Sequence, residues 1–137
     1  MRVVLDTNVV LRALSSKSSL RLIVDALYEG HYEMIISNEI LLEYREKIIQ
    51  FYNPETAESF VAFLQLLPNV NHIEPYFHLN LITADPDDNK FVDCAFAGNA
   101  HYIVTNDRHF RVLQKIEFPT ISTITAEVFK EWLATND

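Results

Sequence analysis

The chain has 137 residues, 49% of them hydrophobic, which fits one globular domain spanning residues 1–137. The formal net charge of −8 argues against a nucleic-acid binder that works through a basic face, because phosphate contacts usually need Lys and Arg. No apolar stretch reaches the roughly 18 residues that span a membrane, and no secretory signal opens the chain, so we expect a cytoplasmic protein. The single cysteine, Cys94, excludes an intrachain disulfide and a multi-cysteine zinc site.

Short apolar runs alternate with amphipathic segments along the chain. Strands are predicted over residues 2–5, 32–36, 101–105 and 118–123, with a further short strand over 70–73. Helices are predicted from residue 9, after a cap at Ser18 or Ser19, after Ser37, after Asn53, after a cap at Asp88, over 108–113, and after Thr125. Residues 75–86 are predicted to be irregular. This alternation predicts an α/β fold with a mostly parallel central sheet and helices on both faces.

Two of the predicted strands are closely followed by an aspartate: Asp6 comes directly after the first, and Asp107 comes two residues after the run at 101–105. Ligands of parallel sheets bind outside the carboxyl ends of the strands, where both acids are expected to lie. Carboxylates suit Mg²⁺ or Mn²⁺, so the pattern predicts a divalent metal site. An aspartate after a strand is also a common helix cap, and Asp6 could do both.

Two further acids come from helices. Glu43 shares a helix face with Ile40 and Tyr44, so it should point near the core. Asp88 closes a run of three acids in four residues, more than a helix cap requires. We therefore predict Asp88 as the main metal ligand of its segment. A single Glu on a helix is usually solvated, so Glu43 taken alone is open between a solvated residue and a ligand. Asp93, about 140° further around the same helix, is open between a ligand, a supporting residue and an ordinary polar helix position.

Other polar residues adjoin these acids. A hydroxyl or an amide that could orient ligands and water follows or precedes each strand-end acid: Thr7, Asn8, Thr105 and Asn106. Lys90 and Arg108 could hold a substrate phosphate or could be solvated surface charges. The histidines share no metal-binding spacing, and we expect a surface role for His109. Cys94 lies between apolar neighbours and is expected in the core.

The four acidic segments together resemble the successive motifs of PIN-domain nucleases, in particular the bacterial and archaeal toxin components akin to VapC. The segments are residues 4–9 (VLDTNV), 37–43 (SNEILLE), 85–91 (DPDDNKF) and 103–107 (IVTND). The resemblance implies a three-layer Rossmann-like fold and an endoribonuclease that uses Mg²⁺ or Mn²⁺ to hydrolyse RNA. It places the catalytic, metal-binding acids at Asp6, Glu43, Asp88 and Asp107. It also implies a homodimer and a cognate antitoxin that inserts a peptide into the acidic cleft.

Other classes of small acidic α/β domain compete with this interpretation. A phosphate-accepting receiver domain would need an acceptor Asp after a middle strand and a Lys after a late one, and the chain has neither. A haloacid-dehalogenase-like phosphatase would need a second Asp where Asn8 stands. A degenerate PIN domain kept only as a binding module is a third alternative, against which the four intact acids argue.

Overall fold

A computed structural model describes residues 1–136 of the chain. Five parallel strands form one sheet in the order β3-β2-β1-β4-β5. Their bounds are Arg2–Leu5 (β1), Glu33–Ile36 (β2), Val70–His72 (β3), Tyr102–Val104 (β4) and Thr123–Ile124 (β5). The predicted α/β fold with a parallel sheet is confirmed.

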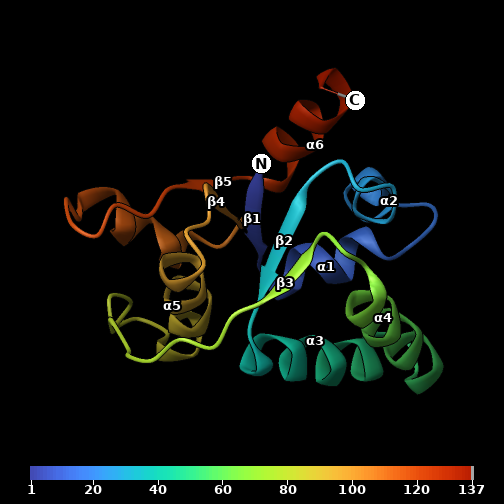
Figure 1. Cartoon of the computed structure of the whole chain (residues 1–137), viewed down its shortest axis with the longest axis horizontal. Helices are drawn as coiled ribbons and strands as arrows, with labels where there is room; N and C mark the ends of the chain where they lie inside the picture. Colours follow the sequence, from blue (N-terminus) through green and yellow to red (C-terminus); the bar gives the residue numbers. More distant parts are fainter. Residues whose placement is uncertain (137) are drawn as a thin grey trace.

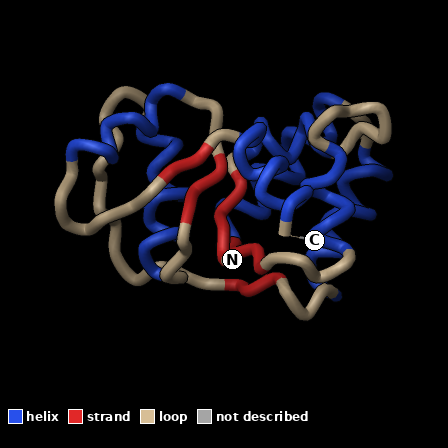
Figure 2. Tube along the Cα trace, turned by 90° about the horizontal axis from the view of Figure 1, so that it is seen from above, coloured by secondary structure: helices blue, strands red, loops and turns tan. Residues whose placement is uncertain are grey.

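The helices lie on both sides of this sheet (Figures 1 and 2). α5 covers one face, α1, α2 and α4 lie on the other side, and α3 crosses below the carboxyl ends of the strands in Figure 1. The α-helices are Thr7–Ala13 (α1), Arg21–Tyr28 (α2), Asn38–Phe51 (α3), Pro54–Leu66 (α4), Asn89–Ala97 (α5) and Ala126–Thr135 (α6). Two 3₁₀ helices, Pro86–Asp88 (η1) and Arg108–Lys115 (η2), precede and follow the α5–β4 unit. Within residues 1–136, no helix combines the length and apolarity needed to cross a membrane.

Side-chain caps set several helix starts where the sequence predicts them. Ser37, Asn53 and Thr125 each accept a hydrogen bond from the backbone N–H three residues later, which satisfies a donor that the first turn leaves without an intrahelical partner. Asn53 is followed by Pro54, whose missing N–H costs nothing at this position. These caps fix where α3, α4 and α6 begin.

Three predictions about individual elements are wrong. Neither Ser18 nor Ser19 caps α2: its N-cap residue is Leu20, and the Ser18 hydroxyl instead accepts from the Leu20 N–H in the preceding turn. The strand predicted over 118–123 is reduced to β5, because Pro119 has no N–H to donate to a neighbouring strand. The helix predicted over 108–113 is a 3₁₀ helix that continues to Lys115.

β1 lies in the middle of the sheet and is buried on both faces, with Val3, Val4 and Leu5 at most 2% exposed. The sequence order of the strands changes side at β1: β2 and β3 lie on one side of it, and β4 and β5 lie on the other. Leu5 pairs with Val104 at the carboxyl ends of β1 and β4. Such a switch point is where open α/β sheets bind ligands, so the fold brings the residues after Leu5 and Val104 to the expected place.

Candidate active site

Asp6 and Asp107 emerge from the ends of β1 and β4 and are joined through Thr105. The Thr105 hydroxyl donates to Asp6 Oδ2 at 2.7 Å and accepts from the Asp107 N–H at 3.0 Å. Asp6 is 5% exposed. Burial, together with the nearby Asp107 and Glu43 charges, raises the pKa of Asp6 to about 6 despite the Thr105 hydrogen bond. The strand ends thus hold the Asp6 carboxyl group, with its raised pKa, in one orientation beside the carboxylate of Asp107.

Asp88 approaches the same place from η1. It is 9% exposed, and burial with the charges of Asp85, Asp107 and Asp6 raises its pKa to about 7. Its Oδ2 atom is buried and has no hydrogen-bond partner among the described residues. Asp88 occupies the predicted N-cap position of α5 but makes no capping hydrogen bond, so that part of the prediction is wrong. The side chain is left available for another partner.

Glu43 reaches the cluster from α3. The Thr7 hydroxyl donates to one carboxylate oxygen of Glu43, and Lys90 Nζ lies 2.9 Å from the other. The adjacent residue, Tyr44, is fully buried and donates its hydroxyl to the Leu5 carbonyl, which fixes α3 against the end of β1. Glu43 therefore faces inward, as its place on the helix predicts.

His109 lies beside the acids, a proximity that the sequence did not predict, and its side chain remains 36% exposed. The carboxylate of Asp107 accepts the His109 N–H at 2.9 Å, which turns the chain into η2. His109 Nδ1 then lies 3.5 Å from Asp107 Oδ1 and 3.7 Å from Asp88 Oδ2. Asp85, Asp88 and His109 each offer a ligand atom within 4.8 Å of the others. In the sequence, Asp85 is only one member of an acidic run, and His109 shares no metal-ligand spacing with another histidine. The position of His109 is set instead by the turn that follows Asp107.

Asp93 is engaged elsewhere. Its buried carboxylate accepts from the Leu79 N–H at 2.9 Å and contacts His78 Nδ1 at 3.0 Å. The Asp93 contact raises the pKa of His78. These contacts tie α5 to the irregular segment predicted over 75–86, which agrees with a structural use of Asp93.

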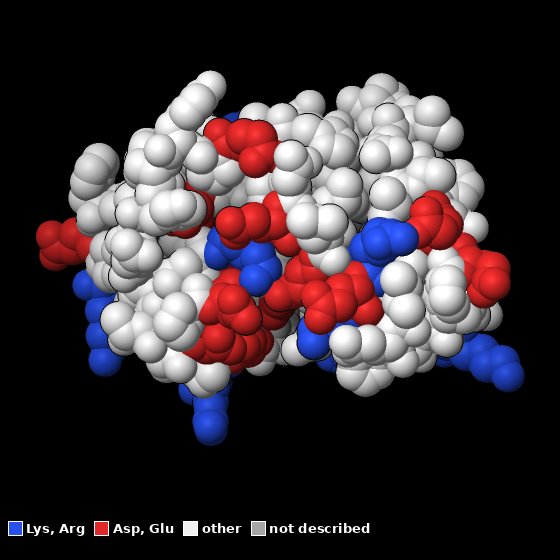
Figure 3. Space-filling view, turned by 90° about the horizontal axis from the view of Figure 1, so that it is seen from below, with Lys and Arg blue, Asp and Glu red and all other residues white. Residues whose placement is uncertain are grey.

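The other predicted supporting residues divide into two groups. Thr7 and Thr105 contact the acids directly. Asn106 turns away from them: its side chain accepts from the Ala126 N–H at 2.9 Å and donates to Glu127 at 3.1 Å. Asn8 and Arg108 are exposed near the cluster. Acidic side chains gather across the middle of this face around a smaller number of basic ones (Figure 3).

The PIN domain family model matches residues 2–109, well over half of the chain and all four acidic segments. The chain belongs to the PIN domain family. Similar solved structures include VapBC2 from Rickettsia felis bound to a DNA fragment from their promoter (18% identity, TM-score 0.62) and FitAcB from Neisseria gonorrhoeae (16% identity, TM-score 0.56). Each alignment covers 91% of this chain and 98% of the other. No curated protein matches the chain.

The family assignment confirms the predicted PIN-domain resemblance, and the solved structures show the same fold. PIN domains are generally nucleases that use divalent metal ions. In this PIN domain the donor set suits such ions, since carboxylate oxygens converge and one buried oxygen has no protein partner. Clustered carboxylates repel one another unless a cation or a proton compensates. Burial is the main cause of the raised pKa values of Asp6 and Asp88, and repulsion between the acids adds to it.

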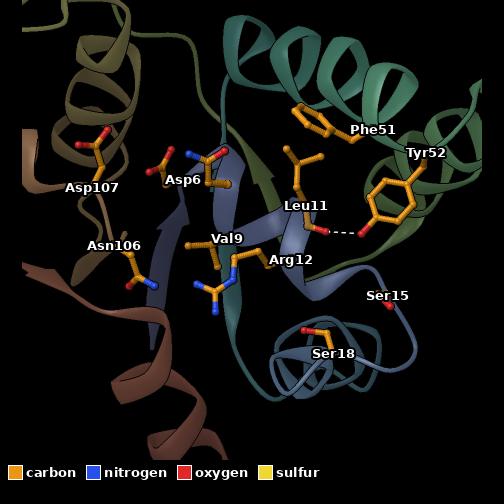
Figure 4. A pocket seen from close by; sticks show the side chains of 11 residues that line it. Asp6, Val9, Leu11, Arg12, Ser15, Ser18, Phe51, Tyr52, Asn106 and Asp107 are labelled. Carbon is orange, nitrogen blue, oxygen red and sulfur yellow. Dashed lines mark hydrogen bonds between the residues drawn. The ribbon is translucent and has the colours of Figure 1, made fainter.

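A groove of about 860 Å³ extends from the acids of this PIN domain (Figure 4). Asp6, Asp107 and Asn106 line one end, and Leu11, Phe51 and Tyr52 line the other, with Arg12 between them. Tyr52 donates its hydroxyl to the Leu11 carbonyl, which fixes the apolar wall. Phe51 remains 69% exposed there. The acidic site thus opens into a groove with one apolar wall.

Proposed function

We propose that this PIN domain is an endoribonuclease that hydrolyses RNA phosphodiester bonds with Mg²⁺ or Mn²⁺, and that it is the toxin of a type II toxin–antitoxin pair. The observation that carries the proposal is the buried acid cluster at the switch point of the sheet. Asp6 and Asp88 have pKa values of about 6 and about 7 in it. Burial and mutual repulsion disfavour the ionised carboxylates of this cluster, and a bound cation would offset both.

Asp6, Asp88, Asp107 and Glu43 would hold the ions. When bound, divalent ions lower the pKa of water and stabilise negative charge that develops on phosphate oxygens. The Thr105 hydroxyl keeps Asp6 in one orientation, and the Thr7 hydroxyl does the same for Glu43. The protein's own contribution is therefore to fix its carboxylates before substrate arrives.

Substrate phosphate needs positive charge near the acids. Lys90 is already occupied, because its Nζ contacts Glu43 at 2.9 Å and the Asp87 carbonyl at 2.8 Å. Arg108 is exposed and follows Asp107 directly. We therefore assign phosphate binding to Arg108 and the positioning of Glu43 to Lys90.

Purified protein, free of any partner, should cleave RNA with Mg²⁺ or Mn²⁺ and stop when EDTA is added. Asp88→Asn should lose this cleavage. Asp87→Asn is the matched control, because Asp87 lies in the same turn with its side chain 89% exposed, and it should retain cleavage. A single-stranded DNA of the same sequence tests the class of nucleic acid. Absence of RNA cleavage under both ions, with metal bound, would favour a degenerate PIN domain that acts as a binding module.

The groove supports the proposed antitoxin. Its acidic end would accept a basic side chain and its wall of Leu11, Phe51 and Tyr52 an apolar one, so an inserted peptide would exclude RNA. A homodimer is proposed from the family resemblance alone. Co-purification with the product of the neighbouring gene, with loss of RNase activity in the complex, tests the partner. Light scattering of the isolated protein tests the dimer.

A further inference from the structure

Asp85, Asp88 and His109 form a mixed oxygen and nitrogen cluster at one side of the four acids. Their ligand atoms lie within 4.8 Å of one another. Asp85 is the N-cap residue of η1 and Asp88 is its last residue, and the Asp85 side chain accepts from the Asp87 N–H at 3.2 Å. His109 comes from η2 and is held by the Asp107 carboxylate through its backbone N–H. Two separate capped turns therefore direct these three side chains to one point.

Two atoms of this cluster have no hydrogen-bond partner among the described residues. They are Asp88 Oδ2 and His109 Nδ1, and both are buried. They face each other at 3.7 Å, too far for a hydrogen bond. Leaving a buried polar atom without a partner destabilises the folded state. A cation between the two atoms would satisfy both, since two ligands bonded to one ion at about 2.1 Å lie within about 3 to 4 Å of each other.

We propose that His109 supplies a nitrogen ligand to a metal ion held with Asp85 and Asp88, and that this makes the protein select Mn²⁺ over Mg²⁺. Mg²⁺ takes oxygen ligands and keeps its waters, whereas imidazole suits first-row transition ions. Of the two ions proposed for this protein, Mn²⁺ is therefore the one that gains from a nitrogen ligand. The inference rests on the proposed metal-dependent function and specifies the ion for it. Asp88 also lies close enough to Asp6 and Asp107 for their negative charges to act on it, so the proposed ion would adjoin the four acids.

The decisive measurement is pulsed electron paramagnetic resonance on the full chain loaded with Mn²⁺. Wild-type protein should show the nitrogen modulation of a directly bound imidazole, and His109→Gln should lose it. The preference for Mn²⁺ over Mg²⁺, measured by calorimetry, should fall at least about tenfold in His109→Gln. His72→Gln is the control, because His72 is exposed in β3, and it should keep both signals. Asp85→Asn should weaken Mn²⁺ binding and keep the nitrogen signal of the ion that remains bound.

Bound Mn²⁺ without nitrogen modulation in wild-type protein would overturn the inference, and His109 would then be an ionic neighbour of the two acids. RNA cleavage by the same sample would leave the proposed nuclease intact. Nitrogen modulation without RNA cleavage would have the opposite meaning, since the metal site would stand and the nuclease would fall. Failure of any divalent ion to bind would overturn both proposals.

Discussion

Replacing Asp6 with Asn should stabilise the metal-free protein while removing the proposed activity. Asp6 has a pKa of about 6, against an ordinary value of 3.8, chiefly because it is buried. In the folded state its ionised form is therefore disfavoured relative to the unfolded chain. The amide of the variant keeps the size of the carboxyl group and an oxygen for the Thr105 hydroxyl, but carries no charge to bury.

The magnitude follows from the shift. About two pKa units correspond to about 3 kcal/mol, and we expect about 1–2 kcal/mol to appear, because the site relaxes and admits water. The folded state binds more protons than the unfolded chain between pH 4 and 6, so the stability contributed by the neutral carboxyl group is present at low pH and lost as pH rises through that window. The advantage of Asp6→Asn is thus absent below about pH 4 and complete above about pH 6.

The assay is urea unfolding or calorimetry of both proteins in EDTA across pH 4 to 8. At pH 7.5 the variant should melt about 3 to 8 °C higher. Adding Mn²⁺ should raise the melting temperature of the wild type more than that of the variant, because a ligand stabilises only the state that binds it. A variant that is less stable at every pH, or a difference that does not change with pH, would refute the reasoning. Asp25→Asn, at a surface ion pair with Arg21, should show no such dependence.

Three further substitutions test the contacts around the acids. Thr105→Val removes the hydroxyl that holds Asp6, and RNA cleavage by the folded variant should fall roughly 10–100-fold; an unchanged rate would contradict a supporting role. Lys90→Gln removes the charge that positions Glu43, so calorimetry should show Mn²⁺ binding weakened roughly 10-fold; unchanged or tighter binding would contradict the positioning role. Tyr44→Phe leaves a buried carbonyl at the end of β1 without its donor, and urea unfolding should report a loss of about 1–2 kcal/mol.

The sequence is sufficient to predict the acids that lie on regular elements. Asp6 and Asp107 follow apolar strands, and parallel strands bring their carboxyl ends to one edge. Glu43 could be placed because a helix repeats every 3.6 residues and its neighbours Ile40 and Tyr44 are apolar. In each case a short local pattern decides the side on which the residue lies. The fold class follows from the same patterns.

The residues that the sequence could not place depend on irregular turns. His109 enters the cluster only because the Asp107 carboxylate caps its backbone N–H, and nothing in the periodicity of residues 108–113 predicts that direction. Asn106 resembles Asn8 in sequence, yet its amide binds the first turn of α6. The position of the last strand was also predicted wrongly. Residues 118–123 have an apolar pattern, but Pro119 has no backbone N–H to donate to β4, and the strand is limited to β5. These outcomes depend on contacts between residues far apart in the chain.

The attachment of Asn106 to α6 bears on how small a working unit this protein can be. The family match ends at residue 109, and a fragment cut there would carry all four acids. It would also lack the Ala126 N–H and the Glu127 carboxylate that hold the Asn106 amide, and the strand β5 that pairs with β4. The loop that bears Asp107 would then be anchored on one side only. α6 therefore supports the loop that carries Asp107. Shortening the chain to residues 2–109 would remove that support.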